Sequence, residues 1–188
     1  MSTILQDTTL LIALCFALVG CSPRPDLNQA VRAAAAIEAD DTCHLCGMSI
    51  MAIPGPKGEW ASKGDPEVRK FCSTLDLFTF YLQPENSHRT EAIYVHDMTL
   101  SPWTTPDDDH FIKAQDAWYV WGSNQQGAMG PALASFGGPA AALAFIDAFG
   151  GQLYRFADIS LALLLAGVNS PMAMPVAVDT PAGTAIKK

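Results

Sequence analysis

The chain has 188 residues, 49% of them hydrophobic, and a formal net charge of −8 at pH 7. This length allows one domain or two small ones, and the acidic balance argues against nucleic acid as a partner. No catalytic triad, phosphate loop or paired-carboxylate signature is present, so we expect no enzymatic activity. Beyond the N-terminal region the cysteines are Cys43, Cys46 and Cys72. An odd number of thiols in an oxidising compartment favours a reactive or metal-bound cysteine over a disulfide framework.

The N-terminus resembles a bacterial lipoprotein signal. An apolar run at 10–19 is too short to span a bilayer, and it ends in Leu-Val-Gly-Cys at 18–21, which is similar to a lipobox. The start carries Asp7 and neither Lys nor Arg, which is unusual for such a signal. The residue after Cys21 is Ser22 and not Asp. By resemblance to lipoproteins of Gram-negative bacteria, this implies lipidation at Cys21, outer-membrane sorting and a protein that faces the periplasm.

Composition divides the chain into five predicted segments. Prolines and an Ala-rich stretch at 30–39, which could form a short helix, suggest a tether, and the Pro-, Ala- and Thr-rich end of the chain has no apolar period. The segments are a lipoprotein signal peptide at 1–20, a lipidated tether at 21–40, a first unit at 41–100, a second unit at 101–168 and a disordered tail at 169–188.

The first unit is predicted to contain four elements, which are strands at 47–53 and 59–63, a helix at 70–81 and a strand at 92–97. Ser73 fits the N-cap of the helix, with Asp76 three residues later in the manner of a capping box. Pro84 ends the helix.

The second unit repeats this order. Its predicted elements are a strand at 117–121, a helix that starts within 135–145 and a strand at 152–156. Pro139 suits the first helical turn and Gly150-Gly151 the helix end. Phe71 and Phe136 are 65 residues apart, as are Phe80 and Phe145. We therefore predict an α+β fold of two homologous ββαβ units, with helices packed on antiparallel sheet.

The densest chemistry lies in Cys43-His44-Leu45-Cys46-Gly47-Met48. Thiols, an imidazole and a thioether suit a soft metal, and a Met beside a Cys points to Cu(I) more than to zinc. Two other interpretations stay open. Cys43 and Cys46 could serve a periplasmic thiol–disulfide oxidoreductase. Alternatively, a structural zinc lipoprotein could use a site built from Cys43, His44, Cys46 and Cys72.

The chain also resembles the NosL family, the copper chaperones of nitrous oxide reductase maturation. The matching pieces are the lipobox, Cys-x-x-Cys-Gly-Met at 43–48, Phe-Cys-Ser-Thr-x-Asp at 71–76, Tyr-Val-x-Asp at 94–97, Ala-Met-Gly-Pro at 128–131 and Phe-x-x-x-x-Gly-Gly ending at Gly151. The resemblance implies two ββαβ units and a Cu(I) site formed by Cys46, Met48 and Met129. It also implies two partners, apo nitrous oxide reductase and the membrane-bound ABC-transporter complex of its maturation.

Simple geometry supports this ligand set. Residues i and i+2 of an extended segment point the same way, so Cys46 and Met48 can share one metal. Met129 lies in a turn-like stretch between glycines. The candidates for accessory metal contacts, or for a second metal ion, are Cys43, His44, His96 and Asp97.

Overall fold

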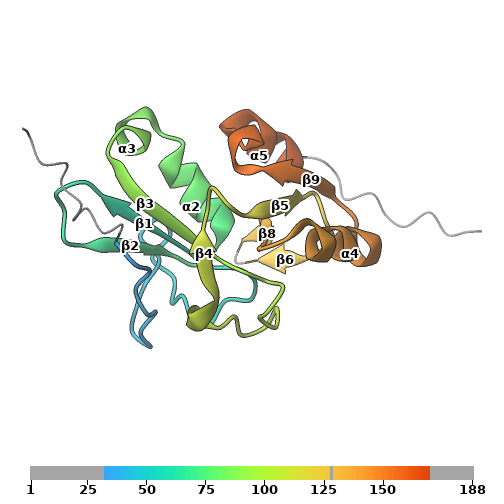
Figure 1. Cartoon of the computed structure of the whole chain (residues 1–188), viewed down its shortest axis with the longest axis horizontal. Helices are drawn as coiled ribbons and strands as arrows, with labels where there is room; N and C mark the ends of the chain where they lie inside the picture. Colours follow the sequence, from blue (N-terminus) through green and yellow to red (C-terminus); the bar gives the residue numbers. More distant parts are fainter. Residues whose placement is uncertain (1–31, 128, 170–188) are drawn as a thin grey trace, which may run out of the picture. The chain divides into compact units, whose positions relative to one another are not determined.

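The computed structural model describes residues 32–127 and 129–169 (Figure 1). The predicted signal peptide, the lipidation site at Cys21 and the predicted tail beyond residue 169 lie outside these residues. Every strand pairing in the described part is antiparallel, and helices contact the sheets, which confirms the predicted α+β class. Within the described residues, the helices are all too short or too polar to cross a membrane.

The first sheet has the strand order β2-β1-β3-β4. Its strands are β1 (Gly58–Ser62), β2 (Val68–Phe71), β3 (Thr90–His96) and β4 (Phe111–Lys113). Strand β1 lies between β2 and β3, so that Trp60 is opposite Arg69 on one side and Ile93 on the other. Helix α2 (Thr74–Tyr81) contacts β1 and β2, and the short α3 (Pro84–Ser87) follows it.

The second sheet repeats this arrangement with the order β8-β5-β9. Its elements are β5 (Trp118–Trp121), β8 (Ala134–Phe136), helix α4 (Pro139–Phe149) and β9 (Gln152–Arg155). In both units the first strand is central, the second and third strands flank it, and the helix joins the flanking strands. Phe71 and Phe136 each end the second strand of their unit, and Phe80 and Phe145 lie in the equivalent helices. The predicted pair of ββαβ units is therefore present.

The local signals at the helix ends behave as predicted. Ser73 caps α2, because its side chain accepts a hydrogen bond of 3.0 Å from the backbone N–H of Asp76. Pro139 occupies the first turn of α4, and Gly150, with φ +75°, ends that helix. Helix α2 begins at Thr74 and not at residue 70, however, because Lys70 and Phe71 belong to β2.

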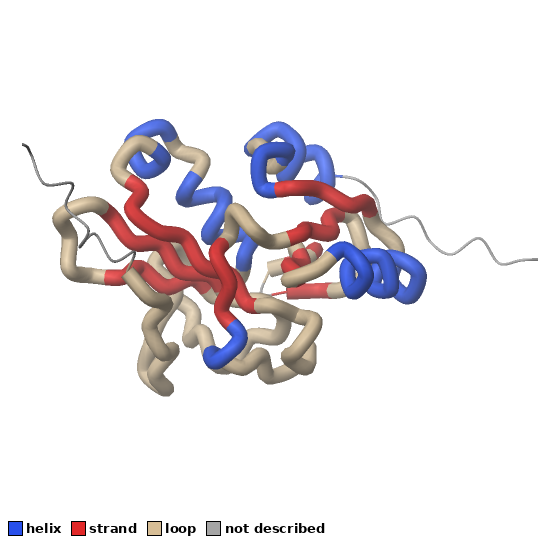
Figure 2. The backbone as a smooth tube through the Cα atoms, in the orientation of Figure 1, coloured by secondary structure: helices blue, strands red, loops and turns tan. Residues whose placement is uncertain are grey.

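The predicted strand at 47–53 is wrong. This segment makes one isolated bridge between Thr42 and Ser49 and otherwise consists of turns and bends. Gly47 adopts φ +74°, which ends extended pairing, and the fully buried Ile50 fills the core instead of lining a sheet. Loops of this kind, tan in Figure 2, also lead from β3 to β4.

The folded part starts before the predicted boundary at residue 41. Residues 32–38 form no helix; they lie along the first sheet. The N–H of Ala35 donates to Glu59, the Tyr94 hydroxyl donates to the carbonyl of Arg32, and Ile37 is buried. The boundary at residue 100 also separates β4 from the sheet it completes, because β4 pairs with β3.

Several elements had no sequence prediction. They are α3, β4 and β8, the hairpin of β6 (Gln126–Gly127) and β7 (Gly130–Pro131), the single turns at Asp108–His110 and Phe156–Asp158, and helix α5 (Leu161–Asn169). Helix α5 contacts α2 and β7. The main core spans both units, because Phe78 of α2 packs on Tyr119 of β5 and on Phe156.

Candidate metal centre

The Cys-x-x-Cys-Gly-Met segment is a closed turn. The N–H of Cys43 donates to the carbonyl of Met48 (2.8 Å), and the N–H of Gly47 donates to the carbonyl of Cys43 (2.8 Å). The extended backbone that would align Cys46 with Met48 is therefore absent. The turn nevertheless keeps the whole motif within one small loop, and a further bond from the N–H of His44 to the carbonyl of Lys70 ties this loop to β2.

The junction between β2 and α2 supplies two more groups. Cys72 follows the last residue of β2 and is fully buried, and Asp76 lies in the first turn of α2. Because the Ser73 cap fixes the start of the helix, the Asp76 carboxylate is held next to the thiol of Cys72, with 3.3 Å between Oδ2 and Sγ. The same oxygen lies 3.4 Å from the Sγ of Cys43.

These residues form a compact cluster of Cys43, Cys46, Cys72 and Asp76, which we call the thiol cluster. All four ligand atoms lie within 4.8 Å of one another, and the Sγ atoms of Cys46 and Cys72 are 3.5 Å apart. A metal about 2.3 Å from each of three sulfurs holds the sulfurs about 4 Å apart. The cluster therefore matches a thiolate-bound metal with small side-chain adjustments.

Exposure and charge distinguish the three thiols. Cys43 and Cys72 are buried, whereas Cys46 is half-buried and reachable from solvent. Hydrogen bonding from Cys72 lowers the pKa of Cys43 to about 4, and the same bond, together with burial, raises the pKa of Cys72. Burial also raises the pKa of Cys46 and of Asp76. The cluster thus favours the charged form of Cys43 more than that of Cys46, and metal binding must displace a proton from Cys46.

The two predicted methionine ligands lie in different places. Met48 closes the cysteine turn and packs partly against the core. Met129 lies at the tip of the β6–β7 hairpin and is 72% exposed. The chain that leaves this hairpin reaches α2, because the hydroxyl of Thr74 donates to the carbonyl of Leu133. Met129 thus belongs to a separate, largely solvated hairpin that is connected to the helix bearing Asp76.

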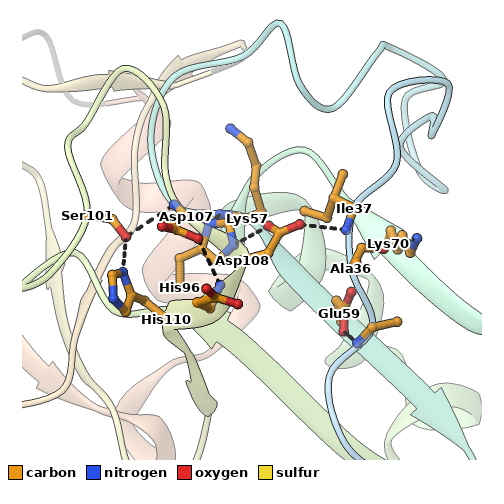
Figure 3. Close-up of polar contacts among 12 residues, drawn as sticks. Ala36, Ile37, Lys57, Glu59, Lys70, His96, Ser101, Asp107, Asp108 and His110 are labelled. Carbon is orange, nitrogen blue, oxygen red and sulfur yellow. Dashed lines mark hydrogen bonds and ion pairs between the residues drawn. The ribbon is translucent and has the colours of Figure 1, made fainter.

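The accessory candidates other than Cys43 have protein partners. His44 packs edge-on against Phe80, with ring centroids 5.1 Å apart. His96 is buried, and both ring nitrogens are engaged, Nδ1 by the N–H of Lys57 (3.3 Å) and Nε2 by Asp108 (3.0 Å; Figure 3). Burial lowers the pKa of His96 to about 4, so this histidine is neutral at pH 7.

Asp97 also has hydrogen-bond partners within the protein. Its Oδ1 accepts hydrogen bonds of 2.8 Å from the N–H groups of Thr99 and Gly137. A metal contact at Asp97 would compete with these bonds, which join the end of β3 to the start of α4.

The chain is similar to known copper-binding proteins. The family model of NosL matches residues 34–164. The chain belongs to the NosL family. It is 43% identical over 157 residues to the copper-binding lipoprotein NosL of Stutzerimonas stutzeri, covering 84% of this chain and 81% of the relative. It is 35% identical to the copper-binding lipoprotein NosL of Achromobacter cycloclastes, covering 68% and 67%.

A solved NosL structure confirms the fold. The crystal structure of the copper chaperone NosL from Shewanella denitrificans superposes with a TM-score of 0.68 at 53% identity, covering 69% of this chain and 97% of that one. These relatives are named as copper-binding proteins and a chaperone, and not as enzymes, in line with the predicted lack of catalysis.

Sequence reasoning missed the role of the β2–α2 junction in the cluster. From the sequence alone, Cys72 is a candidate ligand only for the zinc site, and Asp76 is only part of the helix cap. The available signal was the spacing Cys-x-x-x-Asp across a predicted N-cap, because i and i+4 lie on one face of a helix.

Proposed function

We propose that this chain is a Cu(I) chaperone in the periplasm that carries copper to apo nitrous oxide reductase. The observation that carries the proposal is the thiol cluster, in which a half-buried Cys46 adjoins two buried thiols. Three thiols so close together favour Cu(I), and the partly exposed Cys46 lets an acceptor thiolate or thioether reach the metal. The copper-binding names of the relatives support the same metal.

Cys46 is the central ligand of the proposed site. Met48 on the same turn and Met129 from the β6–β7 hairpin add neutral thioethers on the solvent side, which requires the Met129 side chain to turn from solvent toward Cys46. A site with few charged ligands holds Cu(I) without enclosing it, and this suits release to an acceptor. Because Cys46 must lose its proton to bind, copper affinity should fall as the pH decreases.

We further propose that a lipid at Cys21 anchors the chain to the outer membrane. The lipobox-like sequence at 18–21 and the lipoprotein names of the relatives support this. The anchored domain then meets the recipient enzyme while docked to the membrane-bound maturation transporter.

Anaerobic Cu(I) titration against a competing chelator tests the metal assignment. We expect one tightly bound Cu(I) in the wild type and a loss of affinity of more than about a hundredfold in Cys46→Ser, because changing even the partners of metal ligands costs 10–100-fold. Ser49→Ala, an exposed change on the same turn, serves as the control. Equal affinity of wild type and Cys46→Ser would refute the site. A transfer experiment tests the proposed recipient. The copper-loaded chain is mixed with apo nitrous oxide reductase, the two proteins are separated by size, and the copper in each is measured.

A structural zinc site is the second candidate. Asp76 replaces the predicted His44 as the fourth donor, and three thiolates with one carboxylate are proper zinc ligands. Zinc retained through purification, and not displaced by Cu(I), would favour this candidate. Cu(I) that displaces zinc at once would exclude it.

A further inference from the structure

The thiol cluster contains more sulfur than the proposed copper ligands require. Cys46 serves the metal, whereas Cys43 and Cys72 are buried beneath it and both lie within 3.4 Å of one carboxylate oxygen of Asp76. A buried thiol that contacts a solvent-accessible thiol can be oxidised with it to a disulfide. This reaction needs no metal.

Access decides which thiol reacts first. Cys43 and Cys72 are 2% and 0% exposed, so an oxidant in solution meets Cys46. The Sγ atom of Cys46 lies 3.5 Å from the Sγ atom of Cys72. A disulfide needs about 2.05 Å, so the sulfurs must approach by about 1.5 Å. Rotation of the half-buried Cys46 side chain can close this gap, whereas Cys72 is fully buried between β2 and α2.

We infer that Cys46 and Cys72 form a reversible disulfide that closes the copper site. This inference rests on the proposed function, because it assigns a redox control to the same sulfur that binds Cu(I). The disulfide removes the thiolate of Cys46 from the ligand set. Copper binding is then restricted to the reduced chain, and bound Cu(I) in turn protects Cys46 from oxidation.

A small-molecule disulfide serves as the oxidant in this reaction. The sulfur of Cys46 attacks one sulfur of the oxidant and forms a mixed disulfide. The S–S bond of the oxidant breaks, and its leaving sulfur takes the proton of Cys46 and departs as the first thiol. Cys72 then attacks the sulfur of Cys46, the mixed bond breaks, and the second half of the oxidant leaves as a thiol. Asp76, 3.3 Å from Cys72, accepts the proton that Cys72 loses and passes it to the leaving sulfur. Two cysteine thiols are oxidised and one oxidant disulfide is reduced to two thiols.

Oxidation by glutathione disulfide tests this mechanism. The full chain is held in detergent, with Cys15 and Cys21 replaced by Ser so that the thiol cluster supplies all cysteines. Peptide mapping without reductant should find a link between Cys46 and Cys72 in the wild-type cluster. In Cys72→Ser, a glutathione adduct should accumulate on Cys46, because the resolving thiol is missing. Cys43→Ser is the matched control and should still form the link to Cys72.

Copper binding supplies the functional measurement. Oxidised chain should bind Cu(I) about a hundredfold more weakly than reduced chain or worse, and reduction should restore it. A link of Cys43 to either other cysteine, or unchanged Cu(I) affinity after the Cys46–Cys72 link has formed, would overturn the inference. Failure of the reduced chain to bind Cu(I) would instead refute the proposed function, and the peptide map would still decide the disulfide chemistry.

Discussion

The two ββαβ units share one framework and differ at the junction between their second strand and their helix. In the first unit this junction supplies Cys72 to the thiol cluster. The residue 65 positions later is Gly137, where the N–H donates to Asp97 (2.8 Å) and an added Cβ would lie 2.2 Å from the Asp97 Oδ2. The same backbone junction thus holds a reactive sulfur in one unit and is closed by a carboxylate in the other.

Buried charge is distributed just as unevenly. The buried Lys, Asp, Glu and His side chains among the described residues all lie between 57 and 97, and are Lys57, Glu59, Asp76, His96 and Asp97. Past β4, the buried hydroxyl groups in the described part belong to Tyr119, Ser123 and Ser135. The first unit therefore contains the reactive groups and bears the free-energy cost of burying charged side chains. The second unit packs mainly through apolar side chains and stabilises the first.

Adding a side chain at Gly137, the junction closed by Asp97, should have the largest effect on stability. In Gly137→Ala, the new Cβ displaces a buried carboxylate whose Oδ1 is bonded to Gly137 and Thr99, so we expect a loss of about 3 kcal/mol in the free energy of unfolding. Gly138→Ala is the matched control, because nothing lies within 4 Å of its Cβ position. Denaturant unfolding measures both. Equal stability of the two variants would show that the carboxylate does not close this junction.

The buried carboxyl group of Glu59 should make the stability of the first unit fall as the pH rises. Burial raises its pKa from 4.5 to about 7, and its Oε1 has no hydrogen-bond partner among the described residues. The contribution of this group to stability is therefore full below pH 4.5 and is lost as the pH rises to about 7. Figure 3 shows Glu59 beneath the segment that contains Ala36 and Ile37.

Glu59→Gln, which stays neutral, should remove this dependence. At pH 8 we expect the variant to be more stable than the wild type by roughly 2–3 kcal/mol, and at pH 4.5 the two should be nearly equal. Unfolding curves across this range provide the measurement. Glu67→Gln is the control, because Glu67 is exposed and should show no such crossover. A difference that grows toward acid would contradict the assignment.

The sequence predicted the order of the units better than the details of the site. Alternating strands, the Ser73 cap and the glycines after α4 are local signals, and the structure bears them out. The segment at 47–53 misled because Ile50 is buried by packing and not by a strand partner.

Parts of the cluster could not be found locally. Cys72 meets Cys46 across 26 positions through the pairing of β1 with β2 and the return of the cysteine turn onto β2. The burial of Glu59 depends on the backbone of Ala35, which lies within the predicted tether.

The smallest expected effect on Cu(I) affinity tests whether the second unit contributes to the copper site. Met48 belongs to the first unit and Met129 to the second, so Met48→Leu and Met129→Leu compare the two directly. Each neutral thioether should change Cu(I) affinity by roughly tenfold, equivalent to about 1.4 kcal/mol, less than the loss of the Cys46 thiolate. Met51→Leu, an exposed methionine on the loop after the cysteine turn, should leave affinity unchanged. If Met129→Leu matches this control while Met48→Leu does not, the first unit binds copper alone, and the hairpin of the second unit is left to contact the recipient.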